Sequence, residues 1–299
     1  MPGFGVAQQG NVLTISTGMR KELSLFMGLP RVLTIAGSDT SGGAGIQADL
    51  KTFQELGVYG MTALTTIVAQ NPFKEWQHDV YPQELSVLEA QLDTVLSGIG
   101  ADAVKTGMLG SKEVIDLAAK KIDEHNIETV VVDPVMVCKG TDEPLNPELD
   151  QYLKEVLVPK ALLVTPNLFE AAQLSGLNQV STLEDMKKAA EIIYESGPSF
   201  VLIKGGNDID PDTSIDVFYD GKSFEFVESE RINTEYTHGA GCTHSAAITA
   251  QLVKGRPMRE AIETGKQFAS SAIKESFKLN QYVGAVNHTA YRYHSVTKD

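Results

Sequence analysis

Short apolar runs alternate with amphipathic segments from residue 31 onward. The first run, 31–36, breaks into a glycine-rich polar loop, 37–45, and the helix pattern that follows places Ile46, Leu50 and Phe53 on one face. Apolar strands separated by such helices are typical of a parallel sheet that helices cover on both faces. The pattern therefore predicts an α/β fold.

The same alternation recurs to the end of the chain. Further strands are predicted at 61–68, 103–106, 129–132, 162–165 and 200–203, and further helices at 86–96, 112–125, 241–254 and 258–277. An Asp-Gly turn between 215–219 and 223–227 predicts a hairpin at an antiparallel edge.

One more helix carries its own boundary signals. The capping box 181–184 begins it, and Gly197 with Pro198 ends it. No linker or repeat interrupts the pattern. We expect one domain over 31–299, preceded by a poorly ordered extension, 1–30.

Composition narrows the classes of partner. The 299 residues include 39 acidic and 25 basic side chains, a formal net charge of −14. Such an excess repels phosphate backbones and anionic lipids, and no apolar run approaches the ~18–20 residues of a membrane span. Two cysteines are too few for a disulfide framework, which favours a reducing compartment. We predict no nucleic-acid partner, no membrane association and a cytoplasmic protein.

The first glycine-rich loop has three possible readings. Residues 43–48 match the G-x-G-x-x-A dinucleotide fingerprint. A dinucleotide site also needs an acidic residue at the end of the next strand, and 69–71 is Ala-Gln-Asn there. A tight strand-to-helix turn is the second reading. A polar substrate pocket, with hydrogen bonds from Asp39, Ser41 and Gln70, is the third and the one we favour.

A second glycine cluster, 238–243, leads directly into an alanine-rich helix. Converging backbone N–H groups and the positive end of the helix would form an anion cradle, as phosphoryl transfer requires. A small-residue helix start that packs closely on the sheet is the alternative. Cys242, in the first turn, would have a lowered pKa there and could accept a proton from an attacking hydroxyl. It could equally be a buried cysteine that only fills space.

Polar residues at three further strand ends complete the set. Asp133 and Glu170 suit Mg²⁺, directly or through water, although such residues are also common helix caps. Asn167 shares the loop of Glu170, and Lys204 precedes a Gly-Gly pair from which it could reach a nucleotide phosphate. Together these residues predict magnesium-dependent phosphoryl transfer. A ligand-binding regulator that keeps the fold without catalysis is the alternative from another class.

These motifs resemble those of the vitamin B6 and hydroxymethylpyrimidine kinases of the ribokinase superfamily. The likeness runs from residue 31 to about 284 and rests on 34–39, 41–53, 105–109, 132–136, 165–167 with Glu170, and 239–243. It implies a ribokinase-like three-layer αβα sandwich with a mainly parallel central sheet, usually a homodimer. The implied reaction transfers the γ-phosphoryl group of ATP, with Mg²⁺, to a hydroxymethyl group on a nitrogen heteroaromatic ring.

The resemblance also implies roles for individual residues. Those near the ring would be Gly37, Asp39, Ala44, Gln70 and Met108. The anion hole and the catalytic base would be Gly239, Ala240, Gly241 and Cys242. Those serving the nucleotide would be Asn167, Lys204, Gly206 and His238, with Glu170 and Asp133 for the metal. Most superfamily members have aspartate at the position of Cys242, so the cysteine argues against a sugar substrate.

Two segments bear on the substrate. Residues 135–140 resemble the lid of pyridoxal kinases in which a second cysteine, here Cys138, adds to the aldehyde of pyridoxal as a hemithioacetal. Gln70 and its neighbours resemble the pyrimidine kinases, in which the glutamine reads the aminopyrimidine edge. We expect phosphorylation of pyridoxal, pyridoxine and pyridoxamine, with hydroxymethylpyrimidine also accepted. A dedicated hydroxymethylpyrimidine/phosphomethylpyrimidine kinase of thiamine biosynthesis is the alternative.

Overall fold

The computed structural model describes residues 28–136 and 147–295. The predicted extension 1–30 lies almost wholly outside the described residues, as do Cys138 and most of the lid segment. Within the described part, nine strands form one sheet in the order β3-β2-β1-β4-β5-β6-β7-β8-β9. Their bounds are β1 Arg31–Asp39, β2 Tyr59–Asn71, β3 Gln77–Pro82, β4 Ala103–Thr106, β5 Val130–Val132, β6 Leu163–Val164, β7 Phe200–Lys204, β8 Thr213–Tyr219 and β9 Phe224–Glu230.

The six central strands of the sheet, β2 to β7 in the sheet order, run parallel to one another. β3 pairs antiparallel with β2 at one edge, and the β8–β9 hairpin pairs antiparallel with β7 at the other. The mainly parallel sheet and the hairpin edge confirm both predictions. A small separate pair, β10 Phe277–Lys278 with β11 Gly284–Ala285, follows the last long helix.

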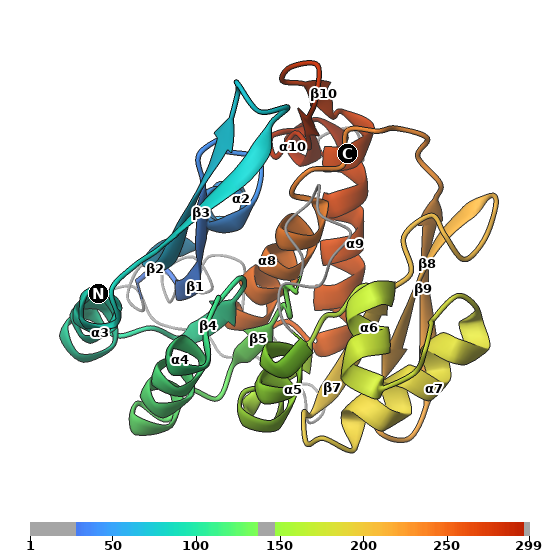
Figure 1. Ribbon diagram of the computed structural model, residues 1–299. Coiled ribbons are helices and arrows are strands. Elements are labelled where there is room, and N and C mark those ends of the chain that lie inside the picture. The colour runs from blue at the N-terminus through green and yellow to red at the C-terminus, as the bar shows by residue number, and fades with distance from the viewer. Residues whose placement is uncertain (1–27, 137–146, 296–299) are drawn as a thin grey trace, which may run out of the picture.

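Helices cover both faces of the sheet and complete the three layers (Figure 1). One layer contains α3 Leu85–Asp93, which continues as a π-helical segment Thr94–Ile99, α4 Lys112–Glu124, α5 Pro147–Val156 with a 3-10 turn Val158–Lys160, α6 Leu168–Ser175 and α7 Leu183–Tyr194. The other contains α2 Gly45–Glu55, α8 Ala240–Val253, α9 Met258–Lys274 and α10 Ala290–Ser295. This is the predicted αβα sandwich.

β5 shows why the central strands are apolar throughout. All three of its valines are fully buried, but Val130 and Val132 pack against the α3–α7 layer while Val131 packs against α8 and α9. Successive side chains of a strand point to opposite faces, and here both faces are covered. A continuous apolar run therefore indicates a central strand with no solvent-facing side.

Several elements were absent from the prediction, namely β3, α5, α6, α10 and the β10–β11 pair, and one boundary was misplaced. β3 is polar and mostly exposed or half-buried, so it has no apolar periodicity to detect. α5 follows the segment outside the described residues. The capping box of α7 is formed by Thr182 and Asp185, not by Ser181 and Glu184, because the hydroxyl that meets the third backbone N–H belongs to Thr182. That helix still ends before Gly197.

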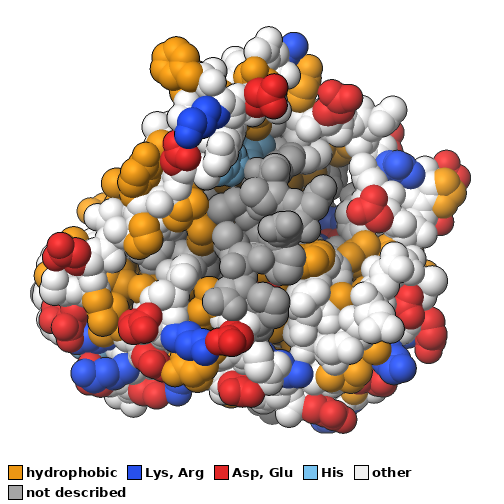
Figure 2. Space-filling model, viewed as in Figure 1, with side chains coloured by type: hydrophobic (Ala, Val, Ile, Leu, Met, Phe, Trp, Pro, Cys, Tyr) orange, Lys and Arg blue, Asp and Glu red, His pale blue; other side chains and the backbone are white. Residues whose placement is uncertain are grey.

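Charged side chains of both signs are interspersed over the α3–α7 face of the molecule (Figure 2). None of the helices in the described part of the chain is long and apolar enough to cross a membrane.

Candidate active site

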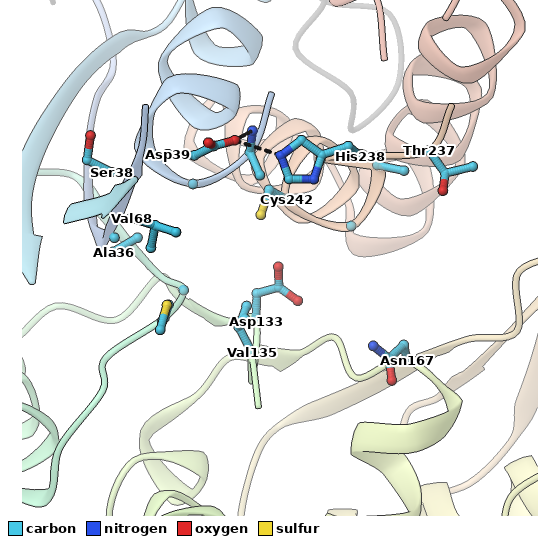
Figure 3. A pocket seen from close by; sticks show the side chains of 18 of the residues that line it. Ala36, Ser38, Asp39, Val68, Asp133, Val135, Asn167, Thr237, His238 and Cys242 are labelled. Carbon is cyan, nitrogen blue, oxygen red and sulfur yellow. Dashed lines mark hydrogen bonds and ion pairs between the residues drawn. The ribbon is translucent and has the colours of Figure 1, made fainter. Parts of the chain in front are cut away.

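A cavity of about 220 Å³ opens where the carboxyl ends of the central strands meet the start of α8. Ligands of open α/β sheets bind at this edge, because the loops that follow parallel strands converge there. Cys242 and Asp133 point into the cavity from opposite sides, and Asp39 lies beside His238 on its wall (Figure 3). Predicted residues that line it are Gly37, Asp39, Ala44, Gln70, Met108, Asp133, Asn167, Glu170, Lys204, His238, Gly239, Ala240, Gly241 and Cys242.

Asp39 organises the first glycine-rich loop from the end of β1. Its Oδ2 accepts hydrogen bonds from the backbone N–H of Ala44 at 2.8 Å and from the Nε2 of His238 at 2.7 Å. Its Oδ1 accepts from the backbone N–H of Ser41 at 2.9 Å and the Nε2 of Gln70 at 2.7 Å. Burial opposes ionisation, but the hydrogen bond and charge of His238, with the smaller contributions of Ser41 and Gln70, hold the pKa of Asp39 well below its usual range. Asp39 is therefore an anion at neutral pH whose oxygens are already engaged by the protein.

His238 lies on the Asp39 side of the cavity. It was expected beside the nucleotide, but it is buried against Asp39, with its Nε2 also 3.5 Å from the Oγ of Ser41. The imidazole lies against the carboxylate of Asp39 because a buried anion needs a hydrogen-bond donor. His238 thus belongs to the same side of the cavity as the residues expected near the ring.

The two glycine clusters cross each other at this wall. Gly239 has a φ of +85°, and a Cβ there would lie 1.8 Å from the carbonyl oxygen of Gly43. At Gly43, a Cβ would lie 2.4 Å from the ring of His238. Only glycine permits both the left-handed backbone and this approach. The contact brings the first loop and the start of α8 together around one cavity.

The predicted anion cradle lies at the first turn of α8, where one of its expected donors is already engaged. The backbone N–H of Ala240 already donates to the carbonyl of Thr237 at 3.1 Å, so Ala240 is not available as an anion donor. The first amides of a helix have no partner within the helix. The remaining donors of the predicted cradle in α8 are therefore the amides of Gly241 and Cys242, at the positive end of the helix.

The predicted lowering of the Cys242 pKa is wrong for the chain without ligands. Burial raises the pKa of the thiol to about 11, and the carboxylates of Asp49 and Asp133 act in the same direction. Lys105 and a hydrogen bond from the backbone N–H of Gly45 oppose the rise but do not cancel it. The helix terminus alone does not overcome desolvation of the sulfur. Cys242 is nevertheless half-buried and open to the cavity, not packed into the core.

A charged cluster forms the opposite side of the cavity. Asp133, at the end of β5, accepts a hydrogen bond from the Nζ of Lys204 at 2.8 Å and one from the Oγ of Ser245 at 3.0 Å. Burial disfavours its charge, but Lys204 and Lys105 outweigh burial and lower the pKa of Asp133. The charges of Asp133 and Glu170 likewise raise the pKa of Lys204 despite its burial. Lys204, at the end of β7, is therefore an ammonium group, and its bond to Asp133 links β7 to the end of β5.

Glu170 and Asn167 form a reciprocal cap at the start of α6. The backbone N–H of Asn167 donates to the Oε2 of Glu170 at 2.8 Å, and that of Glu170 donates to the Oδ1 of Asn167 at 2.9 Å. Burial raises the pKa of Glu170 to about 7, although Lys204 acts against the rise. Glu170 thus has the helix-capping role that was the alternative to metal binding.

Phosphoryl transfer implies a magnesium ion, and the carboxylates of Asp133 and Glu170 fit that ion if water lies between them and the metal. Among the residues that the structure describes, no three His, Cys, Asp or Glu side chains group into a metal site. Both Asp133 and Glu170 are engaged by protein donors. Magnesium usually keeps several waters and binds through phosphates with one or two carboxylates. The pair therefore fits a hydrated ion carried by nucleotide phosphates, held through water.

A second cavity, of about 540 Å³, continues past Lys204. Four residues, Asn167, Lys204, Ala240 and Gly241, line both cavities, and Gly206 lines only the second. The helix start and the lysine therefore lie between a smaller and a larger space. This is the arrangement needed for a group that passes from one bound molecule to another.

Sequence reasoning missed several residues of the site. Lys105 and Asp49 form an ion pair of 3.0 Å below the first cavity, with both side chains fully buried. Ser245 holds Asp133, and Lys266 approaches Asp216 to 3.0 Å in the second cavity. A lysine at the end of an apolar strand was the available signal for Lys105, since lysine is almost never fully buried unless paired.

Taken together, the fold and the site define a phosphotransferase with an alcohol acceptor. The chain belongs to the phosphomethylpyrimidine kinase family, whose model matches residues 39–287. It is 56% identical over 266 residues to the pyridoxine kinase of Bacillus subtilis, covering 89% of this chain and 98% of that one. The hydroxymethylpyrimidine/phosphomethylpyrimidine kinase of the same organism is 43% identical over 270 residues, covering 90% and 98%.

A solved structure agrees with these sequence comparisons. The ADP complex of Bacillus subtilis pyridoxal kinase superposes with a TM-score of 0.86 at 56% identity, covering 89% of this chain and 99% of that one. The resemblance drawn from the motifs is confirmed, and so is the kinase class. A dehydrogenase and a non-catalytic regulator are accordingly set aside.

Proposed function

We propose that this chain transfers the γ-phosphoryl group of MgATP to the 5-hydroxymethyl group of pyridoxal, pyridoxine and pyridoxamine, and also accepts 4-amino-5-hydroxymethyl-2-methylpyrimidine. The observation that carries the proposal is the start of α8, which lines both cavities and places Cys242 in the smaller one. The relative named pyridoxine kinase and the ADP-bound pyridoxal kinase support the substrate and the nucleotide.

In this proposal each side of the site has one task. The ring lies in the smaller cavity, against the wall that Asp39 holds in place. The hydroxymethyl oxygen gives its proton to the Sγ of Cys242 as it attacks the γ-phosphorus, and the amides of Gly241 and Cys242 meet the charge of the transferring group. Lys204 stabilises the phosphates from the opposite side.

The magnesium ion, when bound with ATP, neutralises phosphate charge and helps to align the transferring group. Asp133 and Glu170 would hold it through water, as their occupied oxygens allow. Their contribution is positional, since Lys204 already balances part of their charge.

ADP release at saturating MgATP tests the proposal. Pyridoxal, pyridoxine and the pyrimidine should all be turned over, with a vitamin B6 compound giving the highest kcat/KM. Cys242→Ala should lower kcat by about 10²–10⁴-fold, the usual range for loss of a general base, while ATP binding measured by calorimetry persists. Near-normal turnover by Cys242→Ala would remove this residue as the base.

Cys138 is proposed as the aldehyde partner. Pyridoxal carries an aldehyde and pyridoxine does not, so Cys138→Ala should lower turnover of pyridoxal more than turnover of pyridoxine. Equal losses with the two substrates would contradict the role.

Gln70 favours the pyrimidine as a second substrate. Its Nε2 donates to Asp39 at 2.7 Å, which leaves its Oε1 to accept a hydrogen bond from an exocyclic amine. The relative named hydroxymethylpyrimidine/phosphomethylpyrimidine kinase supports this assignment. Gln70→Leu should raise KM for the aminopyrimidine more than for pyridoxal, and equal effects would exclude selective readout by Gln70.

We further propose a cytoplasmic homodimer. Apolar side chains are exposed along the β2–β3 edge, among them Tyr59 and Tyr81, each 54% exposed, with Val87 on the adjacent α3. Light scattering should give a dimer mass, and Tyr81→Lys should give a monomer. Tyr293→Lys, at a 70% exposed tyrosine on α10, is the matched control and should leave the mass unchanged.

A further inference from the structure

A buried ion pair lies directly beneath the smaller cavity. The Nζ of Lys105, on β4, is 3.0 Å from the Oδ2 of Asp49, on α2, and both side chains have no exposed surface. The Oγ1 of Thr34, on β1, donates to the same carboxylate oxygen at 2.6 Å, while the Oδ1 of Asp49 has no hydrogen-bond partner. A buried ion pair is weak support for stability, because desolvation can exceed the attraction. This pair therefore calls for a role beyond holding the fold.

Lys105 is placed to act on the site. It lines the cavity together with Cys242, although its side chain is closed to solvent. A Cβ added to the neighbouring Gly107, which also lines the cavity, would lie 3.6 Å from the Nζ of Lys105. Its one hydrogen bond among the described side chains goes to Asp49, and an ammonium group has three donors. The ammonium group is thus held close under the floor of the cavity.

Four charged groups act on the Cys242 sulfur from the elements around it. The cations are Lys105 on β4 and Lys204 on β7, and the anions are Asp49 on α2 and Asp133 after β5. Among these charges, the attraction of Lys105 for a thiolate is the largest, and it exceeds the repulsion from Asp49. Burial would lower the pKa of Lys105, but the charges of Asp49 and Cys242 raise it, so Lys105 stays an ammonium group.

We propose that Lys105, held in place by Asp49, is the positioning residue that supplies the counter-charge for the thiolate of Cys242. The proposal rests on the proposed function, in which Cys242 is the base. It gives the thiolate of a desolvated cysteine a counter-charge that opposes the effect of burial: the cation is built into the floor of the site and does not depend on the nucleotide.

Cys242 first loses its S–H proton to solvent and becomes a thiolate beside the Lys105 ammonium. The substrate hydroxyl then gives its proton to the sulfur as its oxygen bonds to the γ-phosphorus. The bond between that phosphorus and the bridging oxygen breaks, and its electron pair leaves with ADP. Lys105 keeps its proton throughout.

The test is the pH dependence of Cys242 alkylation by iodoacetamide. A Cys138→Ala background leaves Cys242 as the sole cysteine, since the chain has two. Lys105→Met should raise the midpoint of alkylation by about one pH unit, the lower end of what a nearby opposite charge contributes. Asp49→Asn should lower the midpoint, because it removes the opposing anion and leaves the ammonium group.

The opposite signs separate an electrostatic role from a structural one, since disruption of the fold would move both variants in the same direction. Lys105→Met leaves Asp49 buried without a cation and could fail to fold, so the double variant Lys105→Met/Asp49→Asn keeps the test decisive. Its midpoint should lie between those of the parent and of Lys105→Met. Thr106→Val is the matched control, since Thr106 is the next residue of β4, is equally buried and carries no charge; its midpoint should equal that of the parent.

Kinetics distinguish failure of this inference from failure of the proposed function. With Cys138 intact, Lys105→Met should lower kcat about tenfold at pH 7 and recover activity as the pH rises. Alkylation midpoints that shift while the kcat profile stays unchanged would show that Lys105 acts on the thiol but that Cys242 is not the base. Equal midpoints in all variants, or shifts of the same sign for Lys105→Met and Asp49→Asn, would overturn the inference about Lys105.

Discussion

The two sides of the cavity manage buried charge differently. On the Asp39 side, one carboxylate is surrounded by donors from the loop, Gln70 and His238, and its pKa lies far below the usual range. On the Lys204 side, two carboxylates surround one lysine, and Glu170 has a pKa of about 7. The first side is complete without a ligand. The second carries more negative charge than its lysine balances, so it can respond when MgATP arrives.

The Asp39 side is therefore preorganised for its ligand, whereas the Lys204 side changes its charge state when its ligand binds. The hydrogen bonds of the Asp39 side are already formed, so this side needs little reorganisation when a flat ring binds. A carboxylate whose pKa lies near neutrality changes its charge when a cation approaches. We therefore expect mutations on the Asp39 side to destabilise the fold and mutations on the Lys204 side to change nucleotide and metal dependence.

The largest effect should come from the crossing of the two glycine clusters. Gly239→Ala places a Cβ 1.8 Å from the Gly43 carbonyl oxygen at a φ of +85°, so we expect a loss of about 4 kcal/mol in the free energy of unfolding and of most activity. Urea denaturation and ADP release measure the two. Gly255→Ala is the control, since its φ is +74° with nothing within 4 Å, and should cost only about 1 kcal/mol. Similar losses for both variants would refute the steric argument.

Removal of Lys204, which Asp133 and Glu170 share, should have the second-largest effect. Lys204→Met leaves Asp133 and Glu170 without their cation, so KM for ATP should rise by about 10²-fold, as expected for loss of a buried charge pair worth 2–5 kcal/mol. Steady-state kinetics with varied ATP measure this. The KM for pyridoxal should change much less. A rise in KM confined to pyridoxal would show that Lys204 serves the ring side of the cavity and not the nucleotide side.

Asp39→Asn tests the preorganised side through the pH dependence of stability. The folded pKa lies below the ordinary 3.8, so the carboxylate stabilises the fold above about pH 4 and that contribution is lost as the pH falls through lower values. We expect the variant to be about 3 kcal/mol less stable at pH 7, with the gap narrowing toward pH 2. Urea denaturation across pH measures the gap. A gap independent of pH would mean that the charge of Asp39 is not what stabilises the loop.

Glu170→Gln should have the smallest effect and the opposite pH dependence. The folded pKa is about 7 and the ordinary value 4.5, so the native state holds its proton more tightly and loses stability as the pH rises between these values. The variant should therefore gain about 2 kcal/mol relative to the parent chain between pH 4.5 and 7.5. It should also need more Mg²⁺ for half-maximal activity. An unchanged magnesium titration would leave Glu170 as a helix cap only.

Much of the fold was predictable because its signals are local. The valines of β5 are buried on both faces and so give a continuous apolar run, and the Asp220–Gly221 turn marks the hairpin at the sheet edge. β3 was not predictable, because its side chains are exposed and its only requirement is pairing with β2. An edge strand is defined by its neighbour, not by its own composition.

The residues of the site likewise divide into those whose position local sequence predicts and those whose position depends on distant segments. Strand-end positions follow from sequence, and parallel strands bring them to one edge, so Asp39, Asp133, Lys204 and Cys242 were predicted to meet and do. The partner of His238 was not predictable, because the residue lies 199 positions from Asp39. Contacts of that range depend on how the loops cross.

By itself, the sequence determined the order of the apolar strands and of the amphipathic helices between them, the two glycine clusters and the chemistry available at the strand ends, since each depends on neighbouring residues and on the periodicity of apolar positions. Only the tertiary structure decided the charge state of those groups. The pKa of Cys242 depends on burial and on Lys105, Asp49 and Asp133, which approach it from three other elements. Electrostatic interactions act through space, so groups distant along the chain determine whether the thiol holds its proton.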